Sequence, residues 1–188
     1  YGLAKDGARA REYEDALMWL KDSGLIRQLF RTTQATFPLK AYIDLKSFKI
    51  FHLDIGLLRV MSGLSPEIII EKEAVFKEFK GAITEQYVLQ QMSGMAEIKD
   101  CYYWTTDASA EIDFLFSYKN LIIPVEVKAG ENLHAKSLRV YIEKYKPDIS
   151  IRTSLRNLQY AEGLINIPLF VFFELISIIS KTVENKKL

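Results

Sequence analysis

Cysteine, histidine and net charge are all scarce in this chain of 188 residues. One cysteine and two histidines exclude a disulfide framework within the chain and a zinc site built from several cysteines. The 25 Lys and Arg side chains oppose 24 Asp and Glu side chains, which leaves a net charge of +1. This balance excludes a strongly basic nucleic-acid binder and an acidic disordered tail. Because disulfides belong to oxidising compartments, the lone cysteine favours a cytoplasmic location.

Long apolar runs are also missing. The most apolar run, residues 164–179, is interrupted by Asn166, Pro168 and Glu174, whereas a membrane-spanning helix needs about 20 predominantly apolar residues. We therefore expect no membrane association, and a buried strand followed by a helix in this run. The chain opens on Tyr1 without the apolar core of a signal peptide, so we expect a fragment of a longer protein.

The first third of the sequence predicts a small unit of helices and strands. The expected elements are a helix over 8–21, strands over 25–31 and 49–53, and a helix over 55–60. Asp54 stands before the second helix, where its carboxylate can accept from the free amides of the first turn. This order is typical of a winged-helix unit. We therefore divide the chain into a winged-helix-like segment, residues 1–64, and a second domain, residues 65–188.

The second domain predicts a mixed α/β fold with a central mixed sheet flanked by helices. The expected elements are a helix over 71–92, strands over 101–105, 111–116 and 121–127, a helix over 134–145 and a strand over 149–151. The polar residues 118–120 are a hairpin connection between two of the strands. The apolar residues 170–180 fit a strand or a helix, because periodicity does not separate the two in a continuous apolar run.

Acidic and basic side chains gather on the predicted hairpin. Side chains alternate across a strand, so Glu126 and Lys128 share one face of theirs, and Glu111 and Asp113 share a face opposite Ile112 and Phe114. A hairpin register can bring Asp113 beside Glu126. Carboxylates this close resist ionisation unless a cation joins them, and Mg²⁺ prefers oxygen ligands. Glu85, on the helix before the sheet, can supply a third carboxylate, whereas Glu111 is more simply an exposed or paired residue.

These residues resemble the PD-(D/E)XK nuclease superfamily, which has the restriction-endonuclease-like fold. Asp113 corresponds to its first acid, Glu126-Val-Lys128 to its Glu-x-Lys element and Glu85 to its helical acid. The resemblance implies a divalent-metal-dependent nuclease with these four residues as catalytic groups. The three carboxylates would bind Mg²⁺ or Mn²⁺.

A second resemblance covers nearly the whole chain. The stretches 49–57, 81–88, 103–104, 111–114, 123–128, 136–138 and 167–169 resemble the C-terminal region of prokaryotic AAA-type ATPases, a domain of unknown function. The resemblance implies a winged-helix segment joined to a nuclease-like domain. It also implies that an upstream ATPase module of the same protein is a partner. No Gly-rich phosphate loop occurs in the chain, so ATP is not expected as a cofactor of this fragment.

Basic residues in the first segment are candidates for contact with DNA. Arg27, Arg31, Lys46 and Lys49 lie among aromatic residues, and a winged helix could place them on DNA phosphates. A protein interface with the ATPase module explains them equally well. A homo-oligomer is a further expected partner state.

Two functions from different classes remain open at this stage. One is a metal-dependent module that binds or cuts nucleic acid. The other is a catalytically inactive relic of a nuclease that serves as a protein-interaction or regulatory module of the ATPase. The remaining chemistry-bearing residues, His52, His134, Cys101 and Trp104, are expected to be structural.

Overall fold

The computed structural model describes residues 10–64, 74–106, 110–130 and 135–185. Its α-helices are α1 (Ala10–Asp22), α2 (Ile55–Met61), α4 (Ala74–Ser93), α5 (Lys136–Tyr145) and α6 (Leu175–Asn185), with 3-10 helices η1 (Leu39–Tyr42) and η2 (Leu169–Glu174). Its strands are β1 (Ile26–Thr32), β2 (Ile43–His52), β3 (Cys101–Thr105), β4 (Glu111–Tyr118), β5 (Leu121–Val127), β6 (Ser150–Ser154), β7 (Gln159–Ala161) and β8 (Leu164–Pro168).

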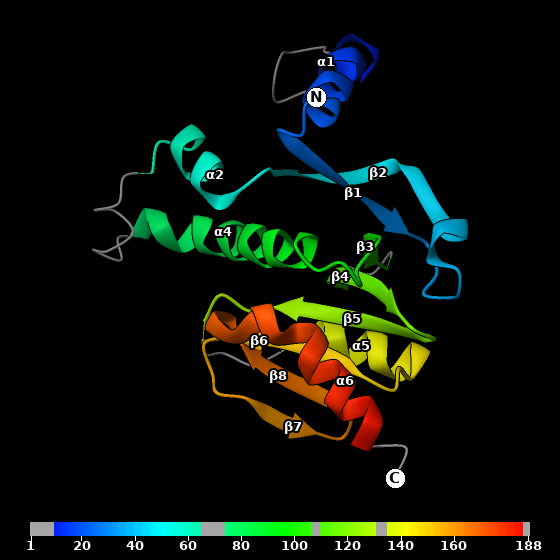
Figure 1. The fold of residues 1–188 in the computed structure, drawn as a ribbon. Coiled ribbons are helices and arrows are strands. Elements are labelled where there is room, and N and C mark those ends of the chain that lie inside the picture. The colour runs from blue at the N-terminus through cyan, green and yellow to red at the C-terminus, as the bar shows by residue number, and fades with distance from the viewer. Residues whose placement is uncertain (1–9, 65–73, 107–109, 131–134, 186–188) are drawn as a thin grey trace.

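The strands of the described chain form one eight-stranded mixed sheet (Figure 1). Their order is β2-β1-β3-β4-β5-β6-β8-β7. The pairs β1/β3, β5/β6 and β6/β8 are parallel, and the other neighbouring pairs are antiparallel. It follows that β1, β3, β5, β6 and β8 run in the same direction and end at one edge of the sheet, here called the carboxyl edge. The predicted mixed α/β class, with a central mixed sheet flanked by helices, is confirmed.

Helices cover both faces of the sheet (Figure 1). On one face, Val88 of α4 and Ile179 of α6 join Phe114 of β4 in the larger hydrophobic core. On the other face, Leu138 of α5 joins Trp104 of β3 in a smaller core. The alternation of side chains along buried strands sends apolar groups to both cores, which explains why these strands are apolar almost throughout.

Helix α4 ties the first segment to the rest of the molecule. The amide of Gln86 donates from Nε2 to the backbone oxygen of His52 and accepts through Oε1 from its backbone N–H, both at 2.9 Å. Gln90 Oε1 accepts from the backbone N–H of Ile55 at 3.0 Å. These bonds satisfy backbone groups at the end of β2 and the start of α2, where neither ladder nor helix can do so. They also fix the position of Glu85, the neighbour of Gln86, relative to the sheet.

A β-bulge reshapes β4 beside the predicted acid. Tyr102 pairs with Leu115 and Trp104 pairs with Ile112, so one residue of β3 lies opposite two residues of β4 between these pairs. The extra residue on β4 changes the direction in which the side chains of this strand point. As a result Phe114 faces the larger core while Ile112 faces the smaller one. The prediction that Ile112 and Phe114 share a face is wrong, because it assumed strict alternation along a strand without a bulge.

Most of the predicted elements are present. Asp54 caps α2 as predicted, since its Oδ1 accepts from the N–H of Leu57 at 2.7 Å. The run 164–179 forms a strand, β8, then η2 and the beginning of α6. Strand β2 is longer than the predicted 49–53, because this outer strand lacks a clean alternation and its register with β1 shifts between Phe30 and Arg31. Strand β7, whose three residues are exposed, was not predicted.

The division of the chain at residues 64 and 65 stays a prediction. Residues 65–73, which contain the boundary, lie outside the described residues. Strand β1 of the first segment pairs with β3 of the second through Arg31 opposite Tyr103 and Thr32 opposite Trp104. The two segments therefore contribute to one sheet.

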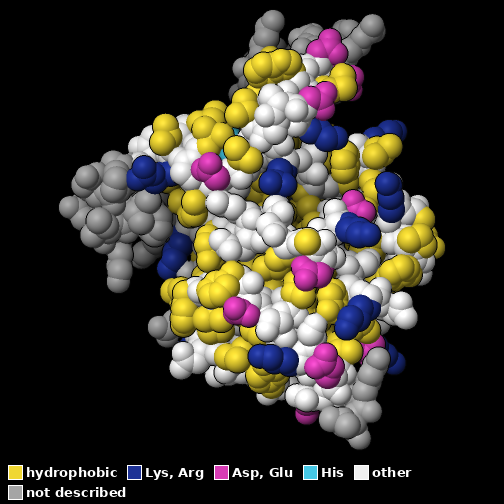
Figure 2. All heavy atoms as spheres, in the orientation of Figure 1, with side chains coloured by type: hydrophobic (Ala, Val, Ile, Leu, Met, Phe, Trp, Pro, Cys, Tyr) yellow, Lys and Arg dark blue, Asp and Glu magenta, His cyan; other side chains and the backbone are white. Residues whose placement is uncertain are grey.

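The surface carries charge of both signs. On the face drawn in Figure 2, Lys and Arg side chains are interspersed with Asp and Glu side chains and with hydrophobic groups, as the near-zero net charge requires. Within the described residues, no helix has the length and apolar character needed to cross a membrane.

Candidate functional site

Sheet topology brings the predicted acids to the carboxyl edge. Glu126 and Lys128 lie at the end of β5, and Asp113 lies near the start of β4, which runs the opposite way. The start of β4 and the end of β5 therefore meet at the same edge. The carboxyl ends of strands in mixed α/β sheets are the usual position of ligand sites.

The side chain of Asp113 continues the contact between β4 and β5 beyond their last backbone pair. The regular pairing stops at Phe114 opposite Val125, and beyond it Asp113 Oδ2 accepts from the backbone N–H of Val127 at 2.7 Å. Burial, then the neighbouring charges of Glu126 and Glu85, raise the pKa of Asp113 to about 8, although the Val127 N–H and Lys49 oppose this. At neutral pH the carboxyl group therefore holds a proton unless a cation replaces it.

Glu126 is the most deeply buried carboxylate of the group, with 4% of its surface exposed. Its Oε1 accepts from Lys128 Nζ at 2.6 Å, whereas its buried Oε2 has no hydrogen-bond partner in the described structure. Burial raises the pKa of Glu126, the bond from Lys128 lowers it, and the charges of Glu111 and Glu85 raise it further. A buried oxygen without a partner costs free energy that a ligand would recover.

Lys49 of β2 enters the same neighbourhood from the first segment. Its ammonium donates to Glu111 Oε1, lies 3.6 Å from Glu85 Oε2 and stands 5.3 Å from the ring centroid of Tyr103. Burial lowers the pKa of Lys49, but the bond to Glu111 and the charges of Glu85, Glu111 and Asp113 outweigh burial and raise it. Lys49 thus stays charged and links helix α4 to strand β4.

The four predicted catalytic residues lie in one electrostatic neighbourhood. The pKa of Asp113 responds to Glu85 and Glu126, and Lys128 is bonded to Glu126. Their catalytic and metal-binding roles stay predictions. Among the described residues, no three Asp, Glu, His or Cys side chains are grouped closely enough to hold a metal ion.

The donor set nevertheless fits a hard divalent cation. Mg²⁺ commonly takes only one or two protein carboxylates and keeps several of its waters. Asp113 and Glu126 form such a pair, since each resists ionisation and Glu126 has one buried oxygen without a partner. Burial and neighbouring carboxylates raise the pKa values in this way, and a divalent cation bound between the two groups would oppose both effects.

The four predicted DNA-contact residues occupy different environments. Arg27 is exposed and lines a cleft of about 600 Å³ together with Lys21, Lys40 and Lys99. The side chain of Lys46 is exposed. Arg31 is paired with Asp44 and Lys49 with Glu111. Contact of these four residues with DNA stays a prediction.

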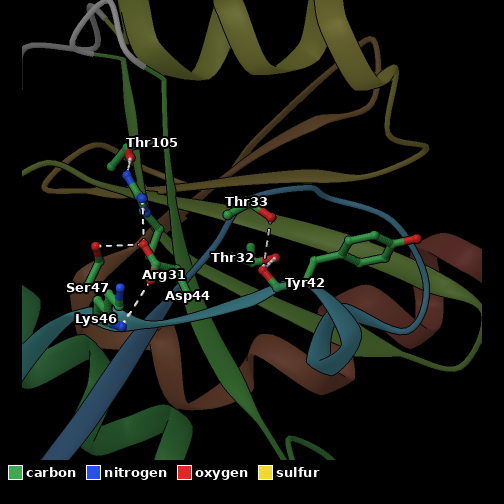
Figure 3. A network of polar contacts seen from close by, with 8 residues as sticks. All are labelled: Arg31, Thr32, Thr33, Tyr42, Asp44, Lys46, Ser47 and Thr105. Atoms are coloured by element: carbon green, nitrogen blue, oxygen red, sulfur yellow. Dashed lines mark hydrogen bonds and ion pairs between the residues drawn. The ribbon is translucent and has the colours of Figure 1, made fainter.

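Arg31 belongs to a polar network at the carboxyl end of β1 (Figure 3). Its Nη2 donates to Asp44 Oδ2 at 2.6 Å and its Nη1 to Thr105 Oγ1 at 3.5 Å. Asp44 also accepts from the Ser47 hydroxyl at 2.8 Å and the Lys46 backbone N–H at 3.0 Å. These bonds, with Arg31, lower the pKa of Asp44. The guanidinium is therefore held by a carboxylate that is itself fixed.

Several residues of this region were not singled out by sequence reasoning. Lys49 was assigned to DNA, not to the carboxylates, because nothing in the spacing links β2 to β4. Arg152 of β6 lies beside Glu126 in the parallel register and belongs to no motif that can be recognised in the sequence. Lys144 of α5 reaches the edge only through the fold. Pairing of Glu111, in contrast, was among the predicted alternatives.

Two of the residues predicted to be structural, Trp104 and Cys101, pack against the cores as expected. Trp104 is 1% exposed and packs edge-on against Tyr141 and Tyr145, with ring centroids 5.2 and 5.6 Å away. Cys101 is a free thiol whose pKa burial raises to about 12. His134 lies outside the described residues.

Comparison with known proteins gives distant relatives of unassigned activity. An uncharacterized protein of Mycobacterium tuberculosis, Rv2008c, is 29% identical over 119 residues, which are 63% of this chain and 24% of that protein. The Mycobacterium bovis protein Mb2031c gives the same values. The matched region thus spans about a quarter of these relatives. The crystal structure of protein VC1899 from Vibrio cholerae covers 93% of this chain and 43% of its own at 14% identity, with a TM-score of 0.35, too low to carry an argument.

Two family models match consecutive parts of the chain. Residues 2–68 match a domain of unknown function, DUF8612, and residues 80–172 match another, DUF4143. The second match contains all four predicted catalytic residues. The two matches follow one another along the chain, and DUF4143 is found C-terminal to AAA ATPases.

Proposed function

We propose that this chain is a C-terminal module of an AAA-type ATPase and that its second domain is a divalent-metal-dependent, nuclease-like phosphodiesterase. The observation that carries the proposal is the pair Asp113 and Glu126: both carboxyl groups have a raised pKa, and Glu126 keeps one buried oxygen without a hydrogen-bond partner in the described structure. The position of DUF4143 after AAA ATPases supports the first part.

The chain's own residues divide the work as follows. Asp113 and Glu126 would hold Mg²⁺ or Mn²⁺, which polarises a phosphoryl oxygen and acidifies a bound water. Lys128, anchored on Glu126 at 2.6 Å, places an ammonium where it can orient an attacking water or stabilise negative charge in the transition state. Glu85 adds negative charge from α4, and Lys49 limits its effect by lying 3.6 Å away.

Calorimetric titration with Mn²⁺ tests the metal site. Because a ligand carboxyl group must lose its proton on binding and the pKa of Asp113 is about 8, the affinity should rise about tenfold per pH unit between pH 6 and 7.5. Asp113→Asn and Glu126→Gln should each abolish binding. Glu143→Gln, on an exposed position of α5, should leave it unchanged.

A cleavage assay tests the reaction. The parent chain, with Mg²⁺ or Mn²⁺, should cut one of supercoiled DNA, single-stranded DNA or RNA, and Lys128→Met should lose cleavage while retaining metal. Absence of Mn²⁺ binding by the parent chain at pH 7.5 would refute the proposal.

A second candidate function is a non-catalytic interaction module of the ATPase. It is favoured by the internal pairing of Lys128 with Glu126 and of Lys49 with Glu111, which neutralises charge without a metal. On this alternative Mn²⁺ does not bind, and pull-down of the upstream ATPase module survives Asp113→Asn.

A further inference from the structure

A small polar pocket lies beyond the carboxyl ends of the parallel strands β1 and β3. Its volume is about 230 Å³, below the roughly 300–1,000 Å³ typical of pockets for whole small molecules. It therefore suits a chemical group better than a complete cofactor. Its walls are two cationic side chains, three threonines and a tryptophan: Arg31, Thr33, Trp104, Thr105, Thr106 and Lys144.

Arg31 is pre-oriented in this pocket. Asp44 and Thr105 hold its two terminal nitrogens, as Figure 3 shows, while its buried Nε has no hydrogen-bond partner in the described structure. A guanidinium matches the oxygens of phosphate and carboxylate groups. An anion that accepts from Nε would remove the cost of the unpaired donor.

Lys144 supplies the second positive charge from another element. Its ammonium lies 5.6 Å from the ring centroid of Trp104 and 5.1 Å from that of Tyr145, so cation–π attraction holds it against the aromatic wall. Among the described residues, Arg31 and Lys144 together with Asp44 leave one net positive charge around the pocket. This balance favours an anion.

Two hydroxyl groups complete the set of donors. Thr105 Oγ1 accepts from Arg31 and Thr106 Oγ1 accepts from the backbone N–H of Ala110 at 3.0 Å. A hydroxyl group that accepts still has its own hydrogen to donate. The pocket thus offers ammonium, guanidinium and hydroxyl donors from several directions, which suits a tetrahedral group better than a planar one.

We propose that this pocket binds a phosphate group, and that in the substrate of the proposed nuclease it holds a backbone phosphate next to the one that is cut. Thr105 pairs with Glu111 across β3 and β4, and Glu111 is bonded to Lys49 in the carboxylate neighbourhood. The pocket and the carboxylates therefore adjoin on one edge. Phosphate binding itself stands on the pocket alone, whereas the substrate assignment rests on the proposed function.

The test uses fluorescence polarisation of a labelled pentathymidylate, in EDTA so that metal plays no part, with inorganic phosphate as competitor. Lys144→Gln should weaken binding of the oligonucleotide about tenfold. It should also lower the slope of log Kd against log salt concentration by about 0.7, which is the contribution of one phosphate contact on a single strand. Lys136→Gln, at an exposed position of the same helix, is the control and should leave both values unchanged. Asp113→Asn should also leave both unchanged, so failure of the metal site and failure of this pocket are separable.

The two sources of phosphate give different results. Oligonucleotide binding that phosphate displaces and Lys144→Gln weakens supports a backbone phosphate. Calorimetry measures the binding of inorganic phosphate. If Lys144→Gln weakens phosphate binding but the parent chain does not bind the oligonucleotide, the substrate assignment is overturned. Equal effects of Lys144→Gln and Lys136→Gln on both ligands would overturn the pocket itself.

Discussion

Replacement of Asp113 by asparagine should remove a large part of the pH dependence of folding. The pKa of Asp113 rises from its ordinary value of 3.8 to about 8 in the folded chain. The folded state therefore holds this proton more tightly than the unfolded state. Its contribution to stability is complete below about pH 4 and is lost as the pH rises through 8.

The size of the effect follows from the width of that window. Each pH unit between the two pKa values changes the free energy of unfolding by about 1.4 kcal/mol. Between pH 5 and pH 8 the parent chain should lose about 4 kcal/mol more than Asp113→Asn. The asparagine oxygen can still accept from the Val127 N–H, so the variant keeps the bond that Asp113 makes at 2.7 Å.

Urea denaturation at pH 5, 6, 7 and 8 in EDTA measures the difference. Other titrating groups are common to both proteins and cancel when the two curves are subtracted. Glu143→Gln controls for the removal of one acid and should track the parent. Parallel curves for the parent and Asp113→Asn would refute the conclusion that Asp113 is protonated in the folded chain.

Three further predictions concern stability and reactivity. Asp54→Ala removes the cap of α2 and should lower the free energy of unfolding by about 1 kcal/mol, with Asp54→Asn close to the parent. Trp104→Ala empties a fully buried site and should cost about 3–5 kcal/mol by urea denaturation, so a loss below 1 kcal/mol would contradict its place in the core. Cys101, with its pKa raised to about 12, should react with iodoacetamide at pH 8 about a thousandfold more slowly than in urea-unfolded chain; equal rates would show that the thiol is not buried.

The strands that carry the candidate site were predictable because their pattern is local. The strands at 101–105 and 121–127 were predicted with the bounds observed, since each is an apolar run between polar connections. The bulge in β4 was not predictable, because it arises from the pairing with β3 and leaves no mark on β4 itself. Strand β7 escaped for a similar reason: it is short and exposed and gains its partner only through the fold.

The candidate site shows the same division. Asp113, Glu126 and Lys128 were chosen as candidates from strand alternation and the hairpin register, and their roles stay predictions. Lys49 could not be linked to them, because its partners Glu85 and Glu111 lie on elements that sequence spacing does not bring near β2. The pocket of Arg31 and Lys144 likewise joins residues that lie far apart in the sequence.

The attachment of Lys49 to β2 has a consequence for how the two segments communicate. Lys49 lowers the pKa of Asp113 from across the sheet, so a displacement of β2 by a few ångströms would weaken that influence. The proton affinity of Asp113 would then rise, and a larger share of this carboxyl group would be protonated at neutral pH. A movement of the first segment would in this way change the ionisation of a group in the second.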